Sequence, residues 1–132
     1  MIGYVGEIRL FAGTFAPRDW AFCDGSLLQI TDFTCLFTLI GTVYGGDGQT
    51  TFALPDLRAR VVVGAGQGGG LASYAIGQAA GTERVPTQPV PVITGNGVEV
   101  DSVAPVSDSN LQPVLGLNYI ICVEGIFPSQ RS

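Results

Sequence analysis

Asp47 and Asp56 are the residues whose type and spacing most invite a catalytic interpretation in this 132-residue chain. Glycoside hydrolysis uses a pair of carboxyl groups, one as general acid and the other as base or nucleophile. The chain holds no histidine and no lysine, so Asp and Glu are the common general bases that remain. Their contexts, Gly-Gly-Asp-Gly and Pro-Asp-Leu, favour a structural role, because Asp folds loops by accepting hydrogen bonds from nearby backbone N–H groups. We therefore predict that the protein is not an enzyme, with a carboxylate-based hydrolase as the remote alternative.

Arg58 and Arg60 invite two interpretations. A spacing of two in a strand would place both side chains on one face. The first interpretation is that they pin the loop by pairing with Asp56, Asp47 or Glu7, because a guanidinium group clamps a carboxylate through two parallel hydrogen bonds. The second is that they lie at a subunit contact or bind an anionic surface glycan.

Trp20 and Tyr44 raise the same question for aromatic chemistry. Exposed, they would be suited to stacking on sugars or to anchoring an interface. Buried, they would belong to the core, which we expect for Trp20 because it stands beside Phe22 in an apolar run.

The three cysteines, Cys23, Cys35 and Cys122, match no zinc-binding spacing, and we predict neither a metal site nor a cofactor. Each has apolar neighbours, so we expect small buried hydrophobic side chains. The alternative is a disulfide between two of them or between two chains.

The composition limits the classes of function. Charged residues make up only 13% of the chain, about half of what is typical, and the net charge is −5. An acidic chain is unsuited to nucleic acid, whose binding depends on clustered cations. The chain has no run of 18 apolar residues, so we predict no membrane insertion. It also lacks the basic residues and apolar stretch that begin a standard signal peptide, so secretion would need another route.

The low charge also bears on assembly, because surface charge normally suppresses self-association. One explanation is a surface covered by Gly, Ser, Thr and Gln. The other, which we favour, is that much of the surface is buried against other copies.

The candidate residues lie in one densely specified stretch, Gly41–Arg60. Its first half is too rich in glycine for a helix or a regular strand. Its second half is extended and closes with Leu54-Pro55-Asp56-Leu57, a rigid corner because proline fixes its own φ and holds the preceding residue extended. A strand at Val61–Val63, which we expect to be buried, follows.

The flanking elements are mostly predicted strands. Residues 4–11 have the period of a half-buried strand that can lie on a sheet edge, and residues 20–23 form a short strand ended by an Asp24-Gly25 turn. Residues 117–124 read as a strand buried on both faces. Residues 64–81 hold many glycines, which favour close packing over phosphate binding.

One short helix is predicted from Thr31, which would cap its start. Phe33, Leu36, Phe37 and Ile40 give it a single apolar face, and Gly41 ends it in a left-handed conformation. Residues 82–110 change character, because prolines interrupt a series of valines around a Gly95-Asn96-Gly97 turn, which indicates a hairpin or arm.

Residues 6–28, 37–61 and 64–83, together with the ending 110–131, resemble the phage tail collar domain, and especially its microcystin-dependent-protein-like branch. The resemblance implies a mixed, mainly β fold with one short helix and long glycine-rich loops. It also implies structural work in trimeric fibres that reach a host surface. The residues that carry this structural signature are Trp20, Cys23, Asp24, Gly25, Gly45, Gly46, Asp47, Gly48, Leu54, Pro55, Asp56, Leu57 and Arg58.

The chain departs from the family in two respects. Relatives carry histidines after the glycine-rich run, and some fibre tips bind a metal with them on the trimer axis; this chain has none, so that site is not carried over. Relatives also carry a long shaft before the domain, whereas here we expect one domain over residues 1–132. Within it, residues 1–83 would form the collar core, residues 84–110 a variable Pro/Val-rich arm, and residues 111–132 the C-terminal core strand.

From these observations we predict a self-assembling structural protein of an extracellular or phage-derived fibre or filament that serves surface attachment. Its partners would be copies of itself, as a trimer or an open filament, and a cell-surface glycan. The alternative is a closed trimeric glycan-binding adhesin or tail-fibre tip. The candidate interface residues are Tyr4, Arg60, Arg84, Val90, Val92, Val98 and Val100.

Overall fold

The computed structural model describes residues 2–81, 84–86, 92–93, 99–100, 107–109 and 113–130. The chain divides into two compact units, Met1–Gln78 with Gly116–Ser132, and Ala79–Leu115, and each is described by itself. The described part is mainly β with one short helix, as predicted. Among the described residues, no helix has the length and apolar character needed to span a bilayer.

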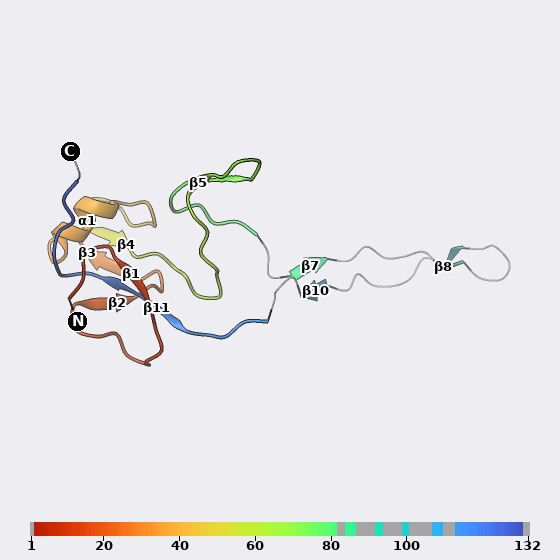
Figure 1. Cartoon of the computed structure of the whole chain (residues 1–132), viewed down its shortest axis with the longest axis horizontal. Coiled ribbons are helices and arrows are strands. Elements are labelled where there is room, and N and C mark those ends of the chain that lie inside the picture. The colour runs from red at the N-terminus through yellow and green to blue at the C-terminus, as the bar shows by residue number, and fades with distance from the viewer. Residues whose placement is uncertain are drawn as a thin grey trace. The chain divides into compact units, whose positions relative to one another are not determined.

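A three-stranded antiparallel sheet forms the centre of the first unit (Figure 1). Its order is β1 (Ile8–Phe11), β11 (Asn118–Cys122) and β2 (Trp20–Phe22), so a strand from the end of the sequence lies between two from its start. In β11, Ile120, Ile121 and Cys122 are all buried, which confirms the predicted strand with both faces covered.

Strand β1 lies at the edge of this sheet, as the sequence allowed, and two of its apolar side chains are exposed. Ile8 and Leu10 are exposed, whereas Arg9 is half-buried. Arg9 bonds Glu7 through Nε–Oε2 at 2.6 Å, and its guanidinium carbon lies 5.1 Å from the centre of the Trp20 ring. The cation–π contact and the ion pair hold the Arg9 side chain beside the Trp20 ring.

The helix α1 (Thr34–Ile40) is shorter than predicted. The prediction that Thr31 caps it is wrong, because Phe33 is the N-cap residue and no side chain bonds the first turn. The apolar face is confirmed, with Leu36 fully buried in the core. Gly41 ends the helix with a positive φ of 54°, although its ψ of −139° lies outside the left-handed helical region.

The core of the first unit gathers where α1 meets a second strand pair, β3 (Leu27–Gln29) and β4 (Thr51–Ala53). Phe52 of β4 is fully buried, and its ring centre lies 5.5 Å from that of Phe37. The backbone of β4 is thereby held directly after the loop that contains Asp47.

The prediction that Val61–Val63 forms a buried strand is wrong. The three residues belong to no strand, and their exposed fractions are 78%, 60% and 54%. None of the strand pairings among the described residues includes these valines. They lead into a small hairpin of β5 (Gly66–Gln67) and β6 (Ser73–Tyr74).

The strands described in the second unit form two antiparallel pairs. Strand β7 (Arg84–Pro86) pairs with β10 (Ser107–Ser109), and β8 (Val92–Ile93) pairs with β9 (Glu99–Val100). These pairings are those of the predicted hairpin. The predicted turn at residues 95–97 lies outside the described residues.

Candidate functional site

Two of the motifs singled out in the sequence bond to each other. The turn at residues 23–26 and the corner at residues 54–57 are joined by three backbone hydrogen bonds, from Gly25 N to Pro55 O at 3.2 Å, from Leu57 N to Cys23 O at 3.0 Å, and from Leu54 N to Ser26 O at 2.9 Å. Asp24 and Asp56 are directly opposite in an antiparallel bridge. The turn and the corner are therefore one backbone structure.

The Asp47 carboxylate folds its own loop. Its Oδ1 accepts the backbone N–H groups of Gln49, Thr50 and Thr51 at 2.8, 2.8 and 2.9 Å, and its Oδ2 accepts the Thr50 hydroxyl at 2.8 Å. These donors favour the ionised form and hold the pKa of Asp47 well below its usual range, the Thr51 N–H having the largest effect. Such a carboxylate is a poor general base, because it gains little by taking a proton.

Gly46 makes the same loop possible. Its φ is +95°, and a Cβ at this position would lie 2.7 Å from the Thr51 carbonyl oxygen and 2.9 Å from Phe52 N. The loop thus passes so close to strand β4 that only a residue without a side chain fits.

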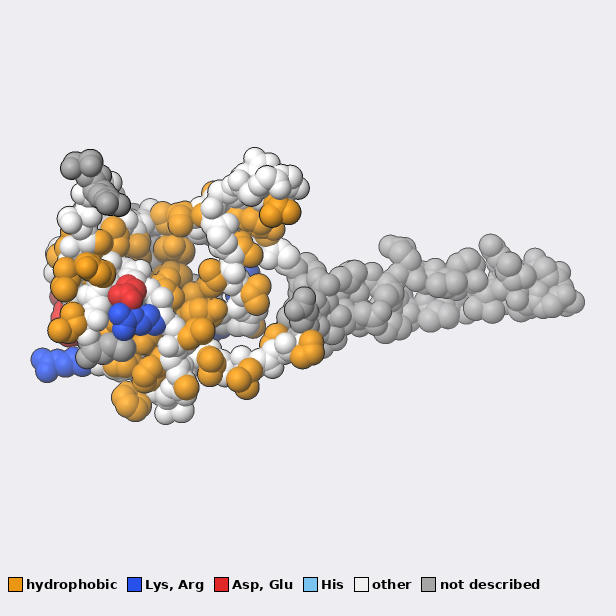
Figure 2. All heavy atoms as spheres, viewed as in Figure 1, with side chains coloured by type: hydrophobic (Ala, Val, Ile, Leu, Met, Phe, Trp, Pro, Cys, Tyr) orange, Lys and Arg blue, Asp and Glu red, His pale blue; other side chains and the backbone are white. Residues whose placement is uncertain are grey.

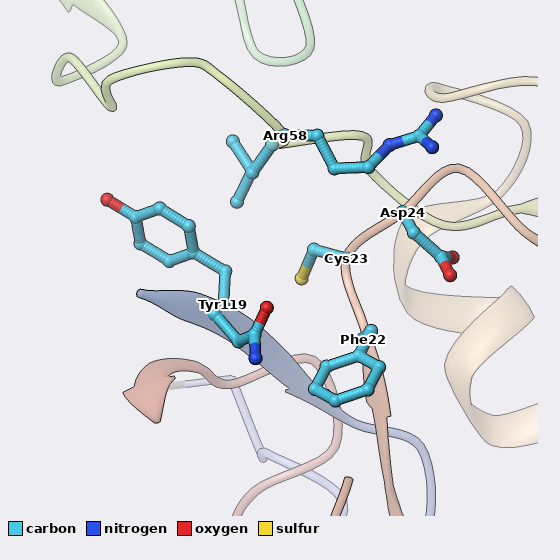
Figure 3. Close-up of a pocket in the computed structure, with 7 residues that line it drawn as sticks. Phe22, Cys23, Asp24, Arg58 and Tyr119 are labelled. Atoms are coloured by element: carbon cyan, nitrogen blue, oxygen red, sulfur yellow. The ribbon is translucent and has the colours of Figure 1, made fainter. Parts of the chain in front are cut away.

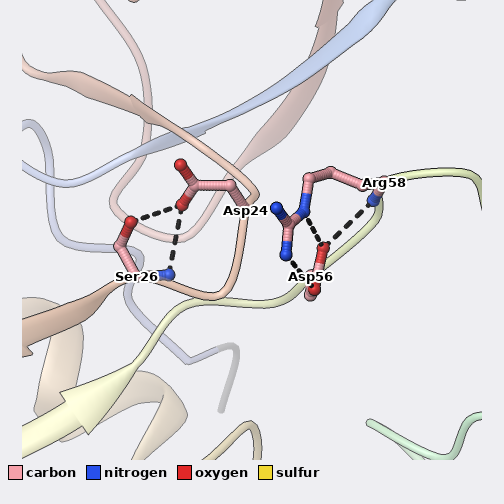
Figure 4. A network of polar contacts seen from close by, with 4 residues as sticks. All are labelled: Asp24, Ser26, Asp56 and Arg58. Carbon is pink, nitrogen blue, oxygen red and sulfur yellow. Dashed lines mark hydrogen bonds and ion pairs between the residues drawn. The ribbon is translucent and has the colours of Figure 1, made fainter.

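The second carboxylate, Asp56, is held by Arg58. The guanidinium Nε donates to Oδ1 and Nη2 donates to Oδ2, both at 2.8 Å, and the Arg58 N–H donates to Oδ1 at 3.2 Å (Figure 4). The side-chain bonds to Arg58 are the main reason that the pKa of Asp56 falls to about 2. This confirms that one of the two arginines pins the corner.

Arg60 does not share that role. The chain turns at Arg58 and Ala59, and the φ of Ala59 is +55°. The prediction of a strand with both arginines on one face is therefore wrong. Within the described part of the chain no ion pair reaches Arg60, which is exposed. The expected alternatives Asp47 and Glu7 are engaged elsewhere, in the loop and with Arg9.

Asp24 stabilises the turn at residues 23–26. Its Oδ1 accepts the Ser26 N–H at 3.1 Å and the Ser26 hydroxyl, which stabilises the turn that Gly25 enters with a φ of +78° (Figure 4). Each carboxylate of the sequence signature thus bonds to residues two to four positions further along the chain.

A hollow of about 240 Å³ opens beside this structure (Figure 3). Its walls come from the end of β2, the corner and the start of β11, and the lining residues are Phe22, Cys23, Asp24, Leu57, Arg58, Asn118 and Tyr119. Its volume is below the roughly 300–1,000 Å³ of pockets for drug-sized ligands, so it suits at most one small group. Asn118 and Tyr119 were not predicted here, because their distance along the sequence left no signal.

The cysteines divide into two kinds. Cys23 and Cys122 are buried, as expected, whereas Cys35 is exposed on α1, so that expectation fails for Cys35. Burial raises the pKa of Cys23 to about 12, with a smaller contribution from the Asp24 charge, and burial also raises the pKa of Cys122. All three are free thiols within the chain. A bridge between two chains stays a prediction.

The remaining candidate residues are scattered. Trp20 is 5% exposed and belongs to the core, and Tyr44 is half-buried. Tyr4 is 56% exposed and so accessible at the surface. Of the arm residues, only the backbone of Arg84, Val92 and Val100 is described, and Val90 and Val98 lie outside the described residues. No group of three or more potential metal ligands was found among the described residues.

The fold and the site define a mainly β domain with one short helix, in which the glycine-rich loop at residues 45–51 is held by the carboxylate of Asp47. Residues 6–62 match the family described as Phage Tail Collar Domain. The Short tail fiber protein gp12 of Enterobacteria phage T4 is 38% identical over 65 residues, which cover 48% of this chain and 12% of that protein. Both matches support the collar family for part of the chain, and the range 6–62 of the first match includes the loop, the corner and the Asp56–Arg58 pair.

Proposed function

We propose that this protein is a non-enzymatic structural component of a phage tail fibre or a phage-derived fibre, which assembles with copies of itself and serves surface attachment. The observation that carries the proposal is the match of residues 6–62 to the Phage Tail Collar Domain, with a tail fibre protein as relative. The finer placement in the microcystin-dependent-protein-like branch is part of the same proposal. So is a location on a virion or an extracellular appendage.

The state of the carboxylates supports a structural role. Asp47 and Asp56 are the only paired candidates from the sequence, and each is already saturated by local donors. A hydrolase would need one of them protonated near neutral pH, and local bonding lowers the pKa of both. Turnover of glycosides by the wild-type protein, lost in folded Asp47→Asn and Asp56→Asn variants, would favour the hydrolase instead.

Two assemblies are open to this chain, a closed trimer and an open filament. Edge strand β1 favours the filament, because within the described residues it pairs on one side only, with β11. It carries no proline, and its one charge, on Arg9, is neutralised by Glu7. A strand of another copy could therefore extend the sheet at this unpaired edge. A contact of this kind that does not close on itself produces a filament.

Electron microscopy of the purified protein at neutral pH tests the proposal. We expect filaments, or discrete oligomers of one size if the contacts close. Single subunits at every concentration would overturn self-assembly. Binding of the labelled protein to bacterial cells, and its competition by soluble surface glycans, tests attachment separately.

A further inference from the structure

Residues 61–78, here called the uncharged segment, form a surface that is unusual for a protein free in water. The segment contains no Asp, Glu, Lys or Arg. Every residue in it except Tyr74 is exposed. Its large apolar side chains are among the most exposed of the described residues, with Val61 at 78%, Leu71 at 69% and Ile76 at 67%.

The segment nevertheless has a defined conformation. Gly66 pairs with Tyr74 and Gln67 with Ser73 in the β5–β6 hairpin (Figure 1). The two glutamines bond backbone groups of the segment itself: Gln67 Nε2 donates to Leu71 O at 3.2 Å, and Gln78 Oε1 accepts the Ala75 N–H at 2.9 Å. The polar groups of both glutamines are therefore used internally, and the large apolar side chains are left exposed.

The segment also packs against the body of its unit. A Cβ at Gly77, whose φ is +80°, would lie 2.5 Å from Val43 Cγ1 and 3.6 Å from the Tyr44 ring. Val43 is itself 49% exposed, so it extends the apolar surface beyond the hairpin. On the visible face of the molecule, hydrophobic side chains far outnumber charged ones (Figure 2).

The size and chemistry of this surface are those of a protein interface. A standard interface involves about 20–30 residues on each side, and the segment with Val43 comes close to that number. Interface cores are depleted of charged residues, as the segment is. Glycine allows two backbones to approach closely, and the segment holds six of the 19 glycines in the chain.

We propose that the uncharged segment is a contact surface for a second copy of this chain. A surface without charge can face an identical surface without like-charge repulsion, even though the chain carries a net charge of −5. The proposal rests on the self-assembly proposed above and names the surface that carries it. The edge of β1 would provide a separate contact in a filament.

A matched pair of substitutions tests the proposal. Leu71→Asp places a charge in the segment, and Leu27→Asp places the same charge on β3, at a leucine that is 62% exposed compared with 69%. Sedimentation velocity over a range of concentrations measures assembly, and circular dichroism checks folding. We expect the Leu71→Asp and Val62→Asp variants to need at least tenfold more protein to assemble, and the Leu27→Asp variant to behave as wild type.

A crosslinking experiment gives an independent readout should the charged variants fail to fold. In a Cys35→Ser background, which removes the exposed thiol, Leu71→Cys should form a disulfide-linked dimer on oxidation and Leu27→Cys should not. Wild-type assembly that persists unchanged in both charged segment variants would overturn this surface and leave the proposed function standing. Equal loss of assembly in Leu27→Asp would also overturn the surface, and a monomeric wild type would overturn both proposals.

Discussion

Asp56 and Arg58 form a two-point ion pair across the corner of the chain, and the Arg58 N–H binds the same carboxylate. The pair closes on itself over two residues, directly after the proline that makes the corner rigid. It thus gives the corner its shape through bonds that do not depend on any ligand.

The pair makes stability depend on pH. Bonding to Arg58 lowers the pKa of Asp56 to about 2 in the folded protein, compared with about 3.9 for a free Asp. Because the folded pKa is the lower one, the stabilisation is complete above about pH 5 and is lost as the pH falls toward 2. Urea unfolding should show wild type more stable than Asp56→Asn at pH 7, with the difference vanishing near pH 2. A stability difference that is unchanged at low pH would contradict this pH dependence. High salt should reduce the difference at pH 7, because the ion pair is exposed.

Removal of the Asp47 carboxylate should loosen the loop that it folds. Asp47→Ala leaves three backbone N–H groups without their acceptor and should lower the melting temperature. Asp47→Asn should have a smaller effect, because an amide oxygen can still accept. Asp32→Ala, at an exposed Asp before the helix, is the control in thermal unfolding. Equal melting temperatures of the Asp47→Ala and Asp32→Ala variants would show that the hydrogen bonds to Asp47 contribute nothing to stability.

Gly46→Ala should destabilise the protein by about 2 kcal/mol or more, because the new methyl group meets the backbone of Thr51 and Phe52 at a positive φ. Gly116→Ala is a suitable control, since its φ is not positive and no atom lies within 4 Å of the added carbon. Chemical denaturation measures both variants. A Gly46→Ala variant as stable as Gly116→Ala would mean that the loop can move away from β4.

The cysteines should differ sharply in reactivity. At pH 8, one thiol per chain of the reduced native protein should react quickly with a disulfide reagent, and three should react after denaturation. The fast one is the exposed Cys35, whereas burial and a raised pKa protect Cys23 and Cys122. Cys35→Ser should remove the fast phase. Without prior reduction, loss of the fast phase from wild type would indicate that Cys35 is bridged between chains.

The sequence by itself determined the local structures, because they depend on neighbours within a few residues. The Asp24-Gly25 turn, the loop around Asp47 and the rigid corner at Pro55 follow from glycine, proline and short-range Asp bonds. The fully covered strand around Ile121 was also predictable, because an uninterrupted apolar run has no polar face to present to water.

Only the tertiary structure decided what depends on distant partners. It placed Arg9 over Trp20, left Ile8 and Leu10 exposed, and bonded the turn at residues 23–26 to the corner at residues 54–57. It also left Val61–Val63 exposed and outside every strand of the described residues. An apolar run indicates burial but does not identify the surface against which it packs. These valines are exposed in the described part of the chain, and the surface they form is therefore available to another copy.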